Sequence, residues 1–133
     1  MKIIFICKHN SFRSKVAEAV FNKWYKGNKY QAMSRGLIPG HFIYPNTKNA
    51  VKSVGYNISG KPKSLMFNES KEADIIVIVS DNVPASIFIN YRKMGKEVIV
   101  WKIKDIDAKE TDKIKKITME IQNKVKQLIK KLK

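Results

Sequence analysis

Cysteine is nearly absent from this 133-residue sequence, which contains only Cys7. A lone cysteine cannot form a disulfide within the chain, so Cys7 is either an inert core residue or a reactive thiol. Cys7 together with His9 suggests a metal site, but His41 is the only other imidazole and zinc normally takes three or four ligands. We therefore expect neither a metal nor another cofactor.

Long apolar runs are also absent. No run approaches the roughly 18 residues of a membrane-spanning helix, so no membrane partner is expected. Lys8 and His9 end the N-terminal run MKIIFIC too early for the apolar region of a signal peptide, and no small-residue cleavage site follows. The sequence therefore predicts a soluble, cytoplasmic protein.

Acidic residues are few: 11 Asp and Glu stand against 27 Lys and Arg, which gives a formal net charge of +16 at pH 7. Such a charge attracts anions, but it does not choose among nucleic acids, acidic membranes and phosphorylated proteins. Residues 111–133 hold eight of the lysines and only two acidic residues. Apolar residues recur there at spacings of three and four, which predicts an amphipathic helix packed on a core with its lysines in solvent. They are Ile114, Ile117, Ile121, Val125, Leu128 and Leu132.

Apolar segments alternate with helical patterns along the chain. Buried parallel strands are predicted at residues 2–6, 73–80 and 97–103, and a weaker strand at 30–34. Helices are expected over residues 14–26, 47–54, 84–93 and 111–133. This alternation predicts one domain over residues 1–133, an α/β three-layer sandwich with a four-stranded parallel sheet and helices on both faces. Such sheets bind ligands at the carboxyl ends of their strands, and Cys7 follows the first strand.

The segment CKHNSFRS, which begins at Cys7, combines a thiol with groups that bind anions. Its loop leads into a predicted helix, so backbone N–H groups and the positive end of the helix dipole should form a concavity for a tetrahedral oxyanion. Arg13 adds a planar guanidinium that can hold two phosphate oxygens. The same field favours the thiolate form of Cys7. A nucleophile beside an oxyanion site suits phosphoryl transfer through a covalent cysteine intermediate.

This segment resembles the catalytic loop of the low-molecular-weight protein tyrosine phosphatases and of the arsenate reductases that share their fold. The resemblance rests on Cys7, Asn10, Arg13 and Ser14, followed by Ala17 and Glu18. Downstream, SRG at 34–36, Pro45, GYNISGKPKSL, EADIIVIV and WKIKDID follow in the family's order. Nearly the whole chain is covered, most weakly over residues 37–44 and 81–96.

The resemblance implies roles for the matching residues. Cys7 would attack phosphorus, Arg13 would hold the equatorial oxygens, Asn10 would fix the loop, and Ser14 would hydrogen-bond the sulfur. The residues expected to bind the substrate's phosphoryl group are Lys8, His9, Asn10, Ser11, Phe12 and Ser14. His9 replaces the family's usual glycine, and Phe12 replaces a common second cysteine, so the partner thiol that can protect the nucleophile is absent.

The family also uses a late aspartate, in an Asp-Pro dipeptide, as general acid for the leaving phenol and then as base for water. Asp105 occupies that place, but Ile106 stands where the proline is expected, and Asp107 remains a competitor. Phe42 and Tyr44 are candidates for a slot around a phosphotyrosine ring. Trp24 has the helical spacing of a core residue.

The first functional hypothesis is a cysteine-dependent phosphomonoesterase of the protein tyrosine phosphatase type, acting on a phosphotyrosyl protein or a small aryl phosphate. Arsenate reduction with an external thiol is the second, because arsenate has the shape and charge of phosphate. Thioredoxin-coupled members of the family need two further cysteines, which this chain lacks, so their intramolecular cascade is excluded. A non-catalytic phosphate-binding or nucleic-acid-binding module is third, since no nucleic-acid motif is present.

Overall fold

The computed structural model describes residues 1–132. The strands are β1 (Lys2–Cys7), β2 (Gln31–Gly36), β3 (Ile75–Val79) and β4 (Glu97–Trp101). The helices are α1 (Arg13–Trp24), α2 (Pro45–Ser53), α3 (Phe67–Glu72), the 3-10 helix η1 (Ala85–Phe88), α4 (Ile89–Lys93) and α5 (Thr111–Lys131). The strands form one parallel sheet in the order β2-β1-β3-β4, which confirms the predicted sheet.

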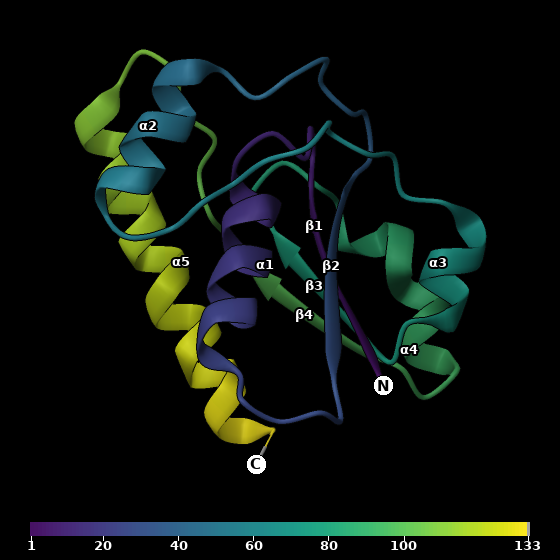
Figure 1. The fold of residues 1–133 in the computed structure, drawn as a ribbon. Coiled ribbons are helices and arrows are strands. Elements are labelled where there is room, and N and C mark those ends of the chain that lie inside the picture. The colour runs from purple at the N-terminus through teal and green to yellow at the C-terminus, as the bar shows by residue number, and fades with distance from the viewer. Residues whose placement is uncertain (133) are drawn as a thin grey trace.

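β1 is an inner strand, paired with β2 on one side and β3 on the other. The register places Cys7, the last residue of β1, beside Gly36, the last residue of β2. Because all strands run the same way, their carboxyl ends share one edge of the sheet, toward the top of Figure 1. The loop that follows Cys7 therefore lies beside the segments that follow β2, β3 and β4.

The sheet is covered on both faces, as the sequence predicts. Figure 1 shows α1, α2 and α5 on one side and α3 and α4 on the other. Successive side chains of β1 point to opposite faces of the sheet, because side chains alternate along a strand. Ile3 and Phe5 belong to the core beneath α1 and α5, whereas Ile4 and Ile6 belong to a second core with Phe88 of η1. The result is the three-layer α/β sandwich.

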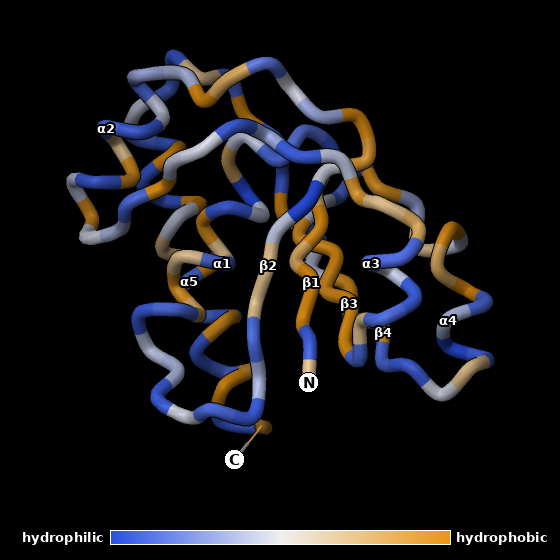
Figure 2. Tube along the Cα trace, turned by 45° about the vertical axis from the view of Figure 1, so that its right-hand side comes forward, coloured by the Kyte–Doolittle hydropathy of each residue, from blue (hydrophilic) through white to orange (hydrophobic). Residues whose placement is uncertain are grey.

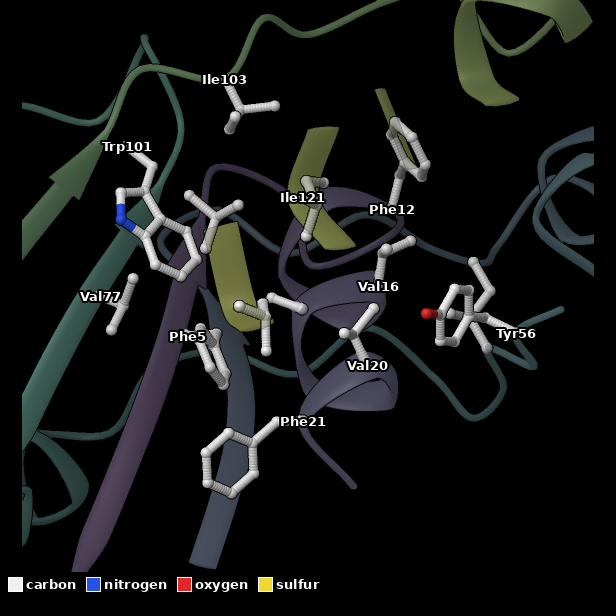
Figure 3. Close-up of a cluster of buried hydrophobic side chains, with 14 of the residues drawn as sticks. Phe5, Phe12, Val16, Val20, Phe21, Tyr56, Val77, Trp101, Ile103 and Ile121 are labelled. Carbon is white, nitrogen blue, oxygen red and sulfur yellow. The ribbon is translucent and has the colours of Figure 1, made fainter. Parts of the chain in front are cut away.

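Aromatic packing fixes α1 against the sheet. The ring of Phe5 lies 6.2 Å from that of Phe21 in α1 and 6.1 Å from that of Trp101 in β4, measured between centroids. Figure 3 shows these rings in one apolar layer between sheet and helix. Burying such a side chain contributes roughly 1.5–3 kcal/mol. Because β1 and α1 are both held in this way, the ends of the loop between them are fixed.

The strands differ in polarity according to their position. In Figure 2 the inner strands β1 and β3 are mostly hydrophobic, whereas β2, at the edge, alternates in colour. All five residues of β3 are buried. Only two of the six residues of β2 are buried, which agrees with its weak signal in the sequence.

α5 has the amphipathic character that the sequence predicts. Ile114, Ile121, Val125 and Leu128 are buried against the core, and Ile117 and Leu132 pack at its margin. Along the part of the chain that the structure describes, no helix is both long and apolar enough to cross a membrane.

The observed helices differ from the predicted ones in two segments. Residues 84–93 form η1 and then the short α4, because Pro84 is extended and the first turn after it closes with a bond from Ile87 N–H to the Pro84 carbonyl. α3 has no counterpart among the predicted helices, because it is only six residues long and carries a single buried residue, Ser70. A helix without an apolar stripe gives no periodic signal.

Trp24 was expected in the core, and this prediction is wrong. Its side chain is 42% exposed at the end of α1. Its Nε1–H donates to the hydroxyl of Tyr56 at 2.9 Å, and the ammonium of Lys126 lies 4.0 Å from the ring centroid. The indole is therefore held at the surface by a hydrogen bond and a cation–π contact.

Candidate active site

The loop between β1 and α1 joins Cys7 to Arg13 at the carboxyl edge of the sheet. Cys7 is buried, and its carbonyl accepts a hydrogen bond from Leu37 N–H at 3.2 Å. The carbonyls of Lys8 and His9 accept from Ile38 N–H and Gly40 N–H at 2.8 and 3.0 Å. The segment after β2 therefore holds the outer, carbonyl side of the loop.

The sulfur of Cys7 lies inside a small hydrogen-bonded group. It accepts a hydrogen bond from Asn10 N–H at 3.2 Å and lies 3.0 Å from the hydroxyl oxygen of Ser14. Asn10 Nδ2 donates to the same Ser14 oxygen at 2.8 Å. A sulfur that faces an N–H and a hydroxyl is stabilised when it carries negative charge.

Asn10 is the residue that bends the loop. Its φ of 54° is in the left-handed region, which asparagine tolerates better than most other residues. It is completely buried, and its Oδ1 accepts a hydrogen bond from Lys63 N–H at 2.9 Å. The segment around Lys63 therefore supports the strained point of the loop from behind.

The loop ends in an uncapped helix. Phe12 is the N-cap residue of α1 and makes no side-chain capping hydrogen bond. Ser14 lies in the first turn of α1. The first N–H groups of a helix have no partner within the helix, so those of α1 are available to an anion beside Cys7.

Arg13 is 2% exposed and points toward the segments that follow β3 and β4. Its Nη1 donates to Ser80 Oγ at 2.9 Å and to the carbonyl of Ile103 at 3.0 Å, and its Nη2 donates to Asn82 Oδ1 at 3.1 Å. Ser80 also donates to Asn82 Oδ1, which links the two polar partners. These bonds fix the plane of the guanidinium.

One edge of the Arg13 guanidinium remains free for a ligand. The group has five N–H donors, and the three bonds just described leave Nε–H and one Nη2–H without a hydrogen-bond acceptor among residues 1–132. Ser80 and Asn82 are bonded to each other and accept from Nη1 and Nη2, so they occupy the edge between these two nitrogens, and the free donors lie on the edge between Nε and Nη2. Such an edge can bind two oxygens of one oxyanion.

The two aspartates proposed as alternatives lie in different surroundings. Asp105 Oδ2 is 3.7 Å from Arg13 Nη2, and its side chain is 45% exposed. Asp107 Oδ1 instead accepts a hydrogen bond from Lys109 N–H at 2.8 Å. Asp105 is therefore the aspartate of the pair that the structure brings to Arg13. Asp81, which the sequence analysis did not consider, also lies 3.6 Å from Arg13 Nη1.

A cavity of about 160 Å³ adjoins the loop. Its lining includes three of the predicted loop residues, His9, Ser11 and Phe12, together with Asp105 and Tyr44. Tyr44 packs edge-on against Phe42, with ring centroids 4.9 Å apart. Of the two aromatic residues proposed for a substrate slot, Tyr44 thus lines this cavity, whereas Phe42 contacts Tyr44 and is not among the lining residues.

Several residues around the loop were missed in the sequence. Ser80 and Asn82 follow β3, and their contact with Arg13 depends on the strand order. Their only signal in the sequence is that polar residues follow a buried strand at its carboxyl end. Lys63 gave no signal, because it contributes only its backbone N–H to Asn10.

Gly36 was noted only as part of the SRG segment, but its size is required by the loop. A Cβ at this position would lie 2.9 Å from both the Asn10 nitrogen and the His9 carbonyl carbon, which are backbone atoms. We expect Gly36→Ala to reduce the free energy of unfolding by about 1–3 kcal/mol, because backbone must shift. Urea denaturation measures this loss.

Gly40→Ala is the matched control for that experiment. A Cβ at Gly40 meets its nearest neighbours at 3.9 Å, an ordinary contact distance. Equal stability of the two variants would show that the loop accommodates a methyl group at Gly36 without cost.

The chain has a parallel α/β fold and a Cys-x5-Arg loop between its first strand and first helix. These two features together define a class of enzymes, and the chain belongs to it. The chain belongs to the low molecular weight phosphotyrosine protein phosphatase family, whose model matches residues 2–133. This confirms the resemblance seen in the sequence.

Relatives in this family are named as arsenate reductases or as phosphatases. Arsenate reductase 1 of Staphylococcus epidermidis is 32% identical over 120 residues, which cover 90% of this chain and 88% of that protein. An arsenate reductase of Brevibacillus brevis is 30% identical over 125 residues, covering 93% and 90%. The crystal structure of a low molecular weight protein tyrosine phosphatase from T. tengcongensis has a TM-score of 0.83 and 25% identity, covering 98% of this chain and 99% of that one.

Proposed function

We propose that this protein is a cysteine-dependent phosphomonoesterase of the protein tyrosine phosphatase type. The observation that carries the proposal is the position of the Cys7 sulfur, which faces Asn10 N–H and Ser14 at the N-terminus of α1. In addition, one edge of the Arg13 guanidinium is free. A nucleophile and oxyanion donors on the same loop support this proposal, because phosphoryl transfer needs both.

In the first step, the Cys7 thiolate attacks phosphorus and a P–S bond forms as the bond from phosphorus to the leaving oxygen breaks. Asp105, in its protonated form, gives its proton to the leaving phenolate. In the second step, Asp105 takes a proton from water, the water oxygen attacks phosphorus, and the P–S bond breaks. Phosphate leaves, and the thiolate and the protonated aspartate are restored.

The substrate proposed is a phosphotyrosyl protein or a small aryl phosphate. Tyr44 lines the cavity beside the loop and offers an aromatic surface for a phenyl ring. The test is hydrolysis of an aryl phosphate by the purified protein, with and without a metal chelator. Turnover that the chelator leaves unchanged supports the proposal, and absence of turnover contradicts it.

Arg13→Lys tests whether phosphate binding needs the planar guanidinium or only its positive charge. Lysine keeps the positive charge but cannot bind two oxygens through one planar edge. We expect kcat to fall by roughly 10²–10³, the usual cost of losing a transition-state donor. Affinity for inorganic phosphate should fall as well, which competitive inhibition measures.

Arg92→Lys is the control for this substitution, since Arg92 lies in α4 and donates to the carbonyl of Val98. Its kinetics should match those of the wild type. If Arg13→Lys also retains wild-type kinetics, Arg13 is a structural cation and the proposed phosphate site is wrong.

Arsenate reduction with an external thiol is the second candidate, favoured by the relatives named arsenate reductase. The Cys7 thiolate would bond to arsenate with loss of water. An external thiol would then attack the Cys7 sulfur, and the As–S electron pair would leave with arsenic, giving arsenite and a mixed disulfide. A second thiol would release Cys7 and form the external disulfide. The two thiols thus supply the two electrons.

The assay is arsenite formation from arsenate with a small thiol, compared with thioredoxin as the only reductant. Cys7 is the only cysteine in the sequence, so no second thiol of this chain can resolve the adduct. Arsenite formation with the thiol at a rate above that of aryl phosphate hydrolysis favours this candidate over the first.

A further inference from the structure

A second cavity, of about 310 Å³, lies between α1, β2 and the segment 57–63. Cys7, Arg13 and Asp105 are not among the residues that line it. Its charged lining consists of the basic residues Lys15, Arg35, Lys61 and Lys63 and the acidic residue Glu18. The cavity is therefore strongly positive.

Lys15 is the buried cation of this cavity. The residue is 8% exposed, and its ammonium donates to the carbonyl of Ser59 at 3.0 Å. An ammonium has three N–H donors, so two have no acceptor in the part of the chain that the structure describes. Burial lowers the pKa of Lys15, Glu18 and Cys7 oppose this effect, and Lys63 and Arg35 add to it. Basic side chains therefore outnumber acidic ones in the lining of this cavity.

The nearby carboxylates are already engaged. Arg35 Nη2 lies 2.7 Å from Glu69 Oε2, and its Nε donates to the same carboxylate. Burial alone would raise the pKa of Glu69, but the hydrogen bond from Arg35 lowers it below its ordinary value. Glu18 Oε1 accepts a hydrogen bond from Ser34 at 2.7 Å. Within residues 1–132, neither carboxylate forms an ion pair with Lys15, Lys61 or Lys63.

We propose that this cavity is a second anion site, which binds inorganic phosphate or the phosphoryl group of a small phosphate ester. Lys15 would donate its two free N–H groups from the interior, and Lys61 and Lys63 would close on the anion from the exposed side. A dianion with several acceptor oxygens matches several cationic donors better than a single carboxylate does. This proposal does not depend on the chemistry at Cys7.

One backbone segment separates the cavity from the Cys7 loop. Lys63 N–H donates to Asn10 Oδ1, and the Lys63 carbonyl accepts from Gly36 N–H at 2.8 Å. Asn10 in turn donates to Ser14, beside the sulfur. Lys63 therefore borders both sites, because its backbone supports the loop and the residue lines the cavity.

The test is an amide NMR titration of the intact protein with inorganic phosphate and, separately, with phenylphosphonate, which is not hydrolysed. The amides of residues 57–61 report the second site, and those of 8–13 report the Cys7 loop. We expect two different saturation curves. Tighter binding of the phosphonate at 57–61 identifies an ester as the ligand, and tighter binding of phosphate identifies the free anion.

Lys15→Met should weaken binding at residues 57–61 at least tenfold and leave the curve for residues 8–13 in place. Because Lys15 is buried, the exposed pair Lys61→Gln and Lys63→Gln is a second test, with the same expectation. Lys52→Gln, on the exposed face of α2, is the control. If the amides of 57–61 do not shift, or follow the 8–13 curve in every variant, there is no second site.

Discussion

Cys7→Ser is expected to abolish turnover of an aryl phosphate, since loss of a catalytic nucleophile can lower kcat by on the order of 10⁶. A serine hydroxyl is a weaker nucleophile than a cysteine thiol, and without the sulfur the P–S intermediate cannot form. The oxyanion donors remain in place. Inorganic phosphate or vanadate should therefore still bind, and calorimetry would measure this binding directly.

The design separates two explanations of an inactive variant. Retained phosphate binding with no turnover assigns Cys7 to the chemical step. Loss of both binding and turnover, with a lowered melting temperature, would show that serine has collapsed the loop. Undiminished hydrolysis would end the cysteine mechanism, because the sequence contains no other thiol.

The sequence could predict the place of Cys7 because the signals there are local. A buried strand, a polar loop and an amphipathic helix follow one another, and parallel strands bring such a loop to the carboxyl edge. The partners of Arg13 are different. Ser80 and Asn82 are far from it in sequence, and their contact depends on β1 and β3 being neighbours.

Trp24 shows a second limit of sequence patterns. Its spacing from Val20 fits the buried face of α1, but the helix ends there, and the last turn of a helix can reach beyond the core it packs against. Tyr56 and Lys126, which hold the indole at the surface, come from segments distant in sequence. Periodicity identifies a face of a helix, and only the packing shows where that face becomes exposed.

Asp105→Asn is the other substitution with a large expected effect, and it depends on the leaving group. A phenolate of high pKa needs a proton as it departs, and a positioned acid typically contributes roughly 10²–10⁴ in rate. An activated nitrophenolate needs that proton much less. Hydrolysis of phosphotyrosine should therefore slow far more than hydrolysis of a nitrophenyl ester, measured in single turnovers that isolate formation of the phosphoenzyme.

Asp107→Asn is the internal control, because it removes the same charge two residues away. Asp105 lies 3.7 Å from Arg13, whereas Asp107 Oδ1 accepts a hydrogen bond from Lys109 N–H, so only the first should show the dependence on the leaving group. The comparison is needed because Ile106 stands where the family has proline. A leaving-group effect confined to Asp107→Asn would mean that the loop moves to another register when substrate binds. If neither variant shows the effect, the chain uses no aspartate acid here, and arsenate reduction, which releases no phenolate, becomes the better account of the site.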